Sequence, residues 1–254
     1  MRISETPLPG EDGFHEETKA FLAVLRSIPP IPEEDDPNGW FLQIQDHLLR
    51  SPRERMDWWV PFADEALRYS NERHGMPHVR FDPVRVLRCL SDHAVAFVVV
   101  GMGAGYLQGA PYPSYNIDIT PRVDPVNVAG LERALAGLEA RPLTWDGWRS
   151  VAEHTLPGFR RLMTVAGPVN VVDDPWGLGG YDQVKVNAAC LEVSEGLVVS
   201  VASLEDVICS KEAMKDLPGR SSHSRTMDGL HVMMGKETLA LRRKYGTTWK
   251  LSTA

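Results

Sequence analysis

The chain has 254 residues, 43% of them hydrophobic, and a formal net charge of −7. This size allows a substantial buried core, and the acidic balance argues against broad, charge-driven binding to nucleic acid. The longest apolar run, residues 94–100, is far too short to cross a bilayer, and the N-terminus has no apolar signal segment. Three isolated cysteines indicate reduced thiols. We therefore expect a cytoplasmic protein without a membrane partner.

Residues 1–80 are predicted to form a helical N-terminal extension. Amphipathic stretches flank an acidic, proline-rich linker at 28–39, and the letters SPRE at 51–54 match a capping box. The helix that begins there is expected to kink or restart at Pro61. Its aromatic residues are expected to pack in the interior: Trp58, Trp59 and Phe62. This extension is a candidate lid or protein-partner surface.

The next segment alternates helices with short apolar strands. An Asp-Pro pair caps a predicted helix over 82–93, and a β-branched strand over 95–101 ends in glycine. A short helix over 103–109 and a strand over 115–120 follow. Because only short connections separate these elements, we expect them to pack as neighbours in one domain.

The remaining elements complete a mixed pattern. A second Asp-Pro pair opens a helix over 124–139, and two strands, 160–166 and 168–174, are joined near a Gly-Pro pair. Two β segments share 190–201, and Ser203 caps a helix that leads into further helical stretches. This order predicts an α+β or mixed α/β fold with a modest sheet.

The letters VVVGMGAG at 98–105 invite a dinucleotide-binding interpretation, but the spacing excludes it. Prolines at 111 and 113 leave too few residues for a crossover helix, and Tyr106 stands where a third glycine is needed. The spacing instead suits a strand, a glycine turn, a short helix and a neighbouring strand. On that second strand, residues 116 and 118 are two apart and share a face.

These motifs resemble those of the DNA-polymerase-β-like nucleotidyltransferase superfamily, in the branch of abortive-infection-type toxins and antibiotic nucleotidyltransferases. VVVGMGAGYLQGAPYPSYNIDIT at 98–120 resembles its glycine loop and two-acid strand. TVAGPVNVVDDPWGLGGYDQV at 164–184 resembles the strand with a third acid, and VSVASLEDVICSKEAM at 199–214 resembles the segment with a phosphate-contacting lysine. RTMD at 225–228 resembles a later acidic element. The match covers residues 83 to about 234.

The resemblance implies a nucleotidyltransferase-like mixed sheet flanked by helices. The core would span 81–202, and a helical C-terminal part, 203–254, would complete the cleft. The implied activity is transfer of a nucleoside monophosphate from an NTP, with Mg²⁺, to a hydroxyl of RNA such as tRNA, as in toxin–antitoxin systems, or of a small molecule. The implied partners are a nucleotide, the acceptor and, through 1–80, another protein.

The resemblance also assigns site positions. The nucleotide-binding positions are Gly101, Met102, Gly103 and Lys211. The catalytic positions are Asn116, Asp118, Asn170 and Asp228, with Asn116 and Asp118 as metal ligands. Gly101, Asp118 and Lys211 are therefore expected to converge on one cleft.

Four residues depart from the family pattern. Asn116 and Asn170 stand where metal-binding acids are expected, Met102 replaces a small residue, and Tyr112 replaces a basic one. An amide brings no charge to Mg²⁺ and cannot take a proton from an attacking hydroxyl, so we expect weak or absent transfer.

Three explanations stay open. The chain is a pseudo-enzyme that kept the fold for binding or regulation, an active member with a relaxed one-ion site that uses Asp228, or an enzyme silenced by two Asp→Asn substitutions. Met102 and Tyr112 favour natural divergence, because neither resembles a silencing substitution.

Overall fold

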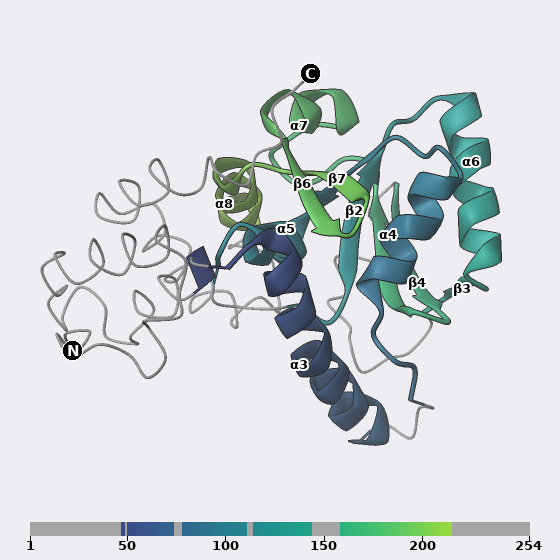
Figure 1. The fold of residues 1–254 in the computed structure, drawn as a ribbon. Coiled ribbons are helices and arrows are strands. Elements are labelled where there is room, and N and C mark those ends of the chain that lie inside the picture. The colour runs from purple at the N-terminus through teal and green to yellow at the C-terminus, as the bar shows by residue number, and fades with distance from the viewer. Residues whose placement is uncertain (1–46, 49, 74–77, 111–113, 144–157, 215–254) are drawn as a thin grey trace, which may run out of the picture.

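The computed structural model describes residues 47–48, 50–73, 78–110, 114–143 and 158–214 (Figure 1). The helices in these ranges are α3 (Pro52–Arg73), α4 (Pro83–Asp92), α5 (Gly101–Leu107), α6 (Pro125–Gly137), α7 (Tyr181–Asn187) and α8 (Leu204–Ala213). The strands are β1 (Phe97–Val100), β2 (Ile117–Pro121), β3 (Arg141–Pro142), β4 (Phe159–Thr164), β5 (Gly167–Val172), β6 (Ala189–Ser194) and β7 (Leu197–Val201).

The strands form one seven-stranded mixed sheet in the order β3-β4-β5-β2-β1-β7-β6. β1 pairs antiparallel with β2 and parallel with β7, whereas β2 pairs parallel with β5. The remaining pairs, β3–β4, β4–β5 and β6–β7, are antiparallel. Helices flank this sheet, so the prediction of an α+β fold with a mixed sheet is confirmed.

The topology brings three element ends to one edge of the sheet. α5 follows β1 directly, and α8 follows β7, the parallel neighbour of β1, so both helices begin at the same edge and pack together. β2 runs antiparallel to β1, so its first residues lie at this edge as well. In Figure 1, α4 and α6 lie side by side against the sheet.

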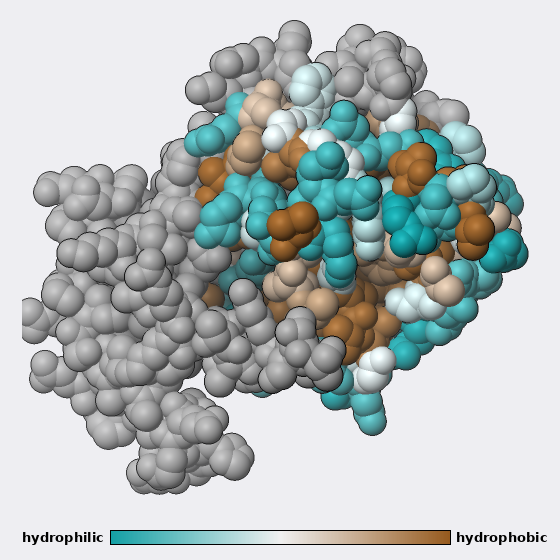
Figure 2. Space-filling model, turned by 90° about the horizontal axis from the view of Figure 1, so that it is seen from above, coloured by the Kyte–Doolittle hydropathy of each residue, from teal (hydrophilic) through white to brown (hydrophobic). Residues whose placement is uncertain are grey.

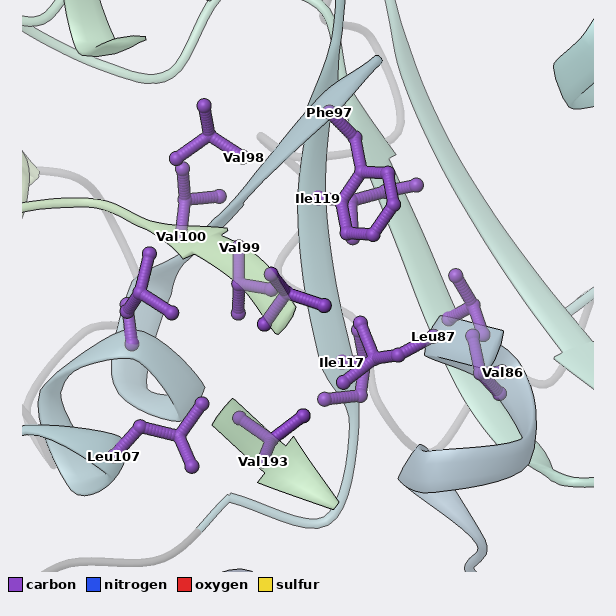
Figure 3. Close-up of a cluster of buried hydrophobic side chains, with 14 of the residues drawn as sticks. Val86, Leu87, Phe97, Val98, Val99, Val100, Leu107, Ile117, Ile119 and Val193 are labelled. Atoms are coloured by element: carbon purple, nitrogen blue, oxygen red, sulfur yellow. The ribbon is translucent and has the colours of Figure 1, made fainter. Parts of the chain in front are cut away.

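The two faces of the central strands differ because side chains alternate along a strand. Val99 pairs with Ile119, and both are fully buried on the face that α4 covers. Figure 3 shows Ile117, on this same face, close to Leu87 of α4. The adjacent pair, Val100 and Asp118, points to the other face. The alternation therefore places Asp118 on the face opposite Ile117 and Ile119.

Predicted helix starts match the observed caps. The Ser51–Glu54 capping box is formed, with the Ser51 N–H donating to Glu54 Oε2 at 2.7 Å and the Glu54 N–H donating to Ser51 Oγ at 3.1 Å. Side chains of Asp82, Asp124 and Ser203 accept backbone N–H groups at the starts of α4, α6 and α8. These caps were predictable because they depend only on nearby residues.

Several local predictions were wrong. α3 continues through Pro61, so the expected restart there was wrong, whereas the alternative, a kink, stays a prediction. Gly101 begins α5 instead of ending the preceding strand. Asn116 lies in a bend before β2, not on the strand itself. Two elements, α7 and β3, were not predicted at all.

α3 belongs to the same hydrophobic core as the sheet. Met56 and Trp59 are fully buried, and the Trp59 ring lies 5.5 Å from Phe81 and 5.6 Å from Tyr106 between centroids. The buried Arg55 side chain donates to the Leu107 carbonyl at 2.5 Å, near the end of α5. The division between 1–80 and 81–202 stays a prediction, but the buried face of α3 packs with the latter part.

The surface of the described residues is mixed. Trp58 and Phe62 are 59% and 61% exposed, so the expectation that they pack in the interior was wrong. Figure 2 shows one face of the molecule, on which the hydrophobic groups of the described residues are interspersed with hydrophilic ones. Among the described residues, no helix is both long and apolar enough to cross a membrane.

Two adjacent tryptophans, Trp58 and Trp59, allow a test of how α3 packs against the hydrophobic core. Trp59→Ala should lower the free energy of unfolding by about 3–5 kcal/mol, because it leaves a cavity in the core. Trp58→Ala, the matched control, should change it by less than about 1 kcal/mol, since it removes only an exposed ring stacked on Arg50. Urea unfolding measures both; equal losses would contradict the packing of α3.

Candidate functional site

A row of polar side chains crosses three neighbouring strands. Asp118 of β2 pairs with Asn170 of β5, and Asn170 pairs with Arg161 of β4. Because directly paired residues point to the same face of a sheet, these three side chains form one row. The row lies on the face opposite Ile117 and Ile119, at the edge where α5 and α8 begin.

The Asp118 carboxylate is held by two amides. Its Oδ1 accepts a hydrogen bond from Asn116 Nδ2 at 2.6 Å and another from Asn170 Nδ2 at 2.7 Å. A carboxylate only accepts hydrogen bonds, so each amide turns its NH₂ group towards it. Asn116 Oδ1 in turn accepts from Ser114 Oγ at 2.6 Å, whereas the buried Asn170 Oδ1 has no hydrogen-bond partner among the described residues.

Gly101 lies directly against Asp118. Its φ is +64°, and a Cβ at this position would collide with Asp118 Oδ2. Both facts require glycine, because L side chains disfavour this backbone region and the carboxylate fills the space of a side chain. The absence of a side chain at Gly101 therefore leaves the space next to the end of β1 that the Asp118 carboxylate occupies.

Opposite charges surround this carboxylate. Burial raises the pKa of Asp118, while Lys211, the Asn170 hydrogen bond, Arg161 and the Asn116 hydrogen bond oppose that rise. Burial lowers the pKa of Lys211, and Asp118 opposes that change. Burial likewise lowers the pKa of Arg161, against the opposing effect of Asp118. The cluster thus places one carboxyl group beside two basic side chains, Lys211 and Arg161.

A tyrosine borders the same cluster. Burial raises the pKa of Tyr115 to about 12, with Arg161 opposing the rise and Asp118 adding to it. The Tyr115 phenol is therefore neutral across the physiological range and adds a polar group without adding charge.

α3 reaches the cluster through hydrogen bonds. The Trp59 indole N–H donates to the Ser114 carbonyl, and the Ser114 hydroxyl bonds Asn116, which bonds Asp118. The Trp59 ring also fills the space beside Gly103, where a Cβ would lie 2.9 Å from Cη2. A helix outside the segment that resembles nucleotidyltransferases thus fixes both the start of β2 and α5.

The structure brings most of the predicted site residues together. Gly101, Asn116, Asp118 and Asn170 are in direct contact or hydrogen-bonded, and Lys211 acts electrostatically on Asp118. Their assigned catalytic and binding roles stay predictions.

Two further predicted positions, Gly103 and Met102, make other contacts. Gly103 packs against Trp59, and Met102 is half-buried against the core. Asp228 lies outside the described residues, as does Tyr112.

The sequence analysis missed three residues of the cluster. Ser114 and Tyr115 precede β2, and Arg161 lies on β4. The turn at 165–166 joins β4 to β5 and fixes the pairing of Arg161 with Asn170. Assigning that turn correctly would have placed a cation next to Asn170.

The described residues supply few metal ligands. Within them, no group of three or more His, Cys, Asp or Glu side chains could hold a metal ion. In the cluster around Asp118, the oxygen Oδ1 already accepts two N–H groups.

Comparisons with known proteins give only a distant likeness. No family model matches the chain, and no curated protein matches it. Among solved structures, a solution structure of the antibiotic-resistance factor ANT(2'')-Ia matches with 15% identity and a TM-score of 0.41, covering 65% of this chain and 89% of that one. A crystal structure of ANT(2'')-Ia with adenylyl-2''-tobramycin matches with 16% identity and a TM-score of 0.41, covering 65% and 95%. A likeness of this size is too weak to carry over an activity, a substrate or site residues.

Two glycines with the same backbone conformation test the contact with Asp118. Gly196 has φ +65° and nothing within 4 Å of an added Cβ, so Gly196→Ala should lower the free energy of unfolding by about 1–2 kcal/mol from backbone strain alone. Gly101→Ala should lower it by about 1–3 kcal/mol more, from overlap with the carboxylate. Urea unfolding measures both. The excess should vanish in an Asp118→Ala background; if it persists, Asp118 is not its cause.

The charge cluster gives a second test. Lys211→Met should raise the pKa of Asp118 further, because Lys211 is the largest influence opposing the effect of burial. Lys185→Met is the control, since Lys185 bonds Ser200 and does not act on Asp118. Carbon-13 NMR titration of the aspartate carboxyls measures both; an unchanged Asp118 pKa in Lys211→Met would contradict the cluster.

The raised pKa of Asp118 also predicts how the stability of the fold depends on pH. Because the folded-state pKa of Asp118 lies above the ordinary value of 3.8, the contribution of this carboxyl to stability is fully present below that value and is lost as pH rises through the folded-state pKa. Asp118→Asn should remove this part of the pH dependence.

Proposed function

We propose that the chain is a nucleotidyltransferase-fold protein that binds a nucleotide and has lost nucleotidyl transfer. The observation that carries this proposal is the double hydrogen bond at Asp118 Oδ1. Asn116 and Asn170, at the positions where the resemblance expects metal-binding acids, both donate to this one oxygen. The pattern supports a pseudo-enzyme over an active transferase.

The donor set around Asp118 does not fit a pair of divalent cations. Mg²⁺ requires near-octahedral oxygen ligands and sheds water reluctantly without carboxylate charge. Asp118 is the one carboxylate of the described cluster, and its Oδ1 accepts from two amides. A metal at this oxygen would have to displace both N–H groups, and the cations Lys211 and Arg161 would repel it.

Loss of the base is a separate obstacle to transfer. In general base catalysis a side chain within hydrogen-bond reach takes the proton of the attacking hydroxyl. Asn170 cannot accept that proton as a base, and its NH₂ group is committed to Asp118. The same position can still orient a ligand, because its buried Oδ1 is an unsatisfied acceptor.

Nucleotide binding is supported by the charges of the cluster. Two basic side chains, Lys211 and Arg161, lie close enough to act on Asp118. Phosphate oxygens are strong acceptors for such cations. Descent from toxin-like enzymes, an RNA or small-molecule acceptor, and a protein partner through 1–80 remain predictions beside this proposal.

Equilibrium binding and transfer assays test the proposal together. The full chain should bind at least one of the four NTPs, and should transfer no label from that NTP to tRNA or to an aminoglycoside in Mg²⁺ or Mn²⁺. Lys211→Met should weaken NTP binding about 10- to 100-fold, as expected for a charge-assisted contact. Lys185→Met, the matched control, should leave binding unchanged.

Two results would overturn the proposal. Robust metal-dependent labelling would show a working transferase, and failure to bind every NTP with and without metal would show that nucleotide binding is lost. The double variant Asn116→Asp with Asn170→Asp should gain a Mg²⁺-dependent rise in melting temperature, because it restores carboxylate charge.

A further inference from the structure

We propose that residues 14–25 form a helix that packs antiparallel against an exposed aromatic row of α3 in the same chain. The row consists of Trp58, Phe62 and Tyr69, which are 59%, 61% and 66% exposed. Residues 14–25 precede the described part of the chain, and their sequence supplies a matching apolar stripe. The proposal assigns a partner to the outer side of α3 and does not depend on nucleotide binding.

The aromatic row is a second apolar stripe on α3. Its members are four and then seven residues apart, so they lie along one side of a helix with 3.6 residues per turn. The side that joins the hydrophobic core is a different one and consists of Met56, Trp59, Ala63 and Leu67. Large exposed apolar groups in a line are typical of a surface on which another element packs.

Residues 14–25 carry a stripe with the same spacing in reverse order. Phe14, Phe21 and Leu25 are seven and then four residues apart, whereas the row of α3 has a step of four and then one of seven. Both stripes extend over eleven residue steps, about 16 Å in a helix. Because one stripe is the reverse of the other, all three positions match only when the two helices run antiparallel.

The same register also matches the one charged position within the row. The facing residues are Leu25 with Trp58, Phe21 with Phe62, Thr18 with Glu65, and Phe14 with Tyr69. Glu65 is exposed and accepts from Arg68 at 3.1 Å, and a carboxylate has lone pairs for a further donor. The Thr18 hydroxyl is such a donor, so the register places polar opposite polar and apolar opposite apolar.

The course of the chain favours this segment over a second copy. The antiparallel arrangement places Leu25 near the start of α3, close to where the described chain begins, so residues 26–46 close a helical hairpin. Three rings at this exposure offer roughly 400 Å², about half of what each partner contributes to a standard interface. A tether raises the effective concentration of the segment to about the millimolar range, so a small contact suffices.

Limited proteolysis of the full chain tests the docking. Trypsin cuts after Lys19, inside the segment, and a docked helix must detach before it is cut. Phe62→Ser should speed this cleavage about 3- to 5-fold, and Phe14→Ser on the facing stripe should do the same. Val126→Ser is the matched control, because Val126 is 80% exposed on α6, and it should leave the rate unchanged.

The expected change is modest because the segment can detach without opening the core. Substitutions in the row therefore alter docking and leave global unfolding nearly unchanged, which agrees with the small loss expected for Trp58→Ala. Thermal unfolding shows whether each variant is folded, and Phe14→Ser supplies the measurement if Phe62→Ser does not fold.

A pair of introduced cysteines tests the register. Thr18→Cys combined with Glu65→Cys should form a disulfide within one chain under mild oxidation, because the two positions face each other. Ala20→Cys with Glu65→Cys is the control and should react much more slowly, since residue 20 lies on the opposite side of the segment helix. Mass spectrometry of the joined peptides distinguishes this bond from any bond of the three native cysteines.

Each outcome decides a point. Faster cleavage in both Phe→Ser variants, together with the Thr18→Cys disulfide within one chain, supports the proposal. Equal cleavage rates in all variants, or equal reaction of the two cysteine pairs, would overturn it. A disulfide between two chains that increases with protein concentration would also overturn it, because a second copy would then supply the segment. Nucleotide binding is measured separately, so the proposed function can fail or hold independently of this result.

Discussion

The rest of this structure depends on the partly buried carboxylate of Asp118, which must be compensated where water is scarce. Removing a charged group from water is costly unless hydrogen bonds and opposite charges replace the water. Here the replacement comes from four elements at once: the bend before β2 supplies Asn116, β5 supplies Asn170, β4 supplies Arg161 and α8 supplies Lys211. The sheet order and the placement of α8 are therefore coupled to one side chain.

The same constraint extends to α3, which lies outside the segment that resembles nucleotidyltransferases. Asn116 can donate to Asp118 because Ser114 holds its oxygen, and the Ser114 carbonyl is held by the Trp59 indole. Trp59 also occupies the space beside Gly103, so it determines how closely α5 approaches. α3 consequently acts as a support for the candidate site.

The sequence predicted features that short-range physics controls and missed those that depend on distant contacts. The helix caps at Asp82, Asp124 and Ser203 were found because each bonds a backbone N–H within three residues. The approach of Arg161 to the site was missed because it depends on the β4–β5 register, which a short turn sets and which a shift of one residue would reverse. The exposure of Trp58 was also missed, since hydrophobicity alone does not show which face of a helix finds a partner.

The two amides have a physical consequence for the protein when no ligand is bound. Three carboxylates at positions 116, 118 and 170 would repel one another, and such a cluster is stable only with a metal or with raised pKa values. Amides at positions 116 and 170 do not repel the Asp118 carboxylate. Each NH₂ group instead donates a hydrogen bond to it and stabilises its charge. The cluster then holds its own shape without an ion. In the unliganded protein the Asp118 carboxylate is therefore stabilised by amides of the chain itself.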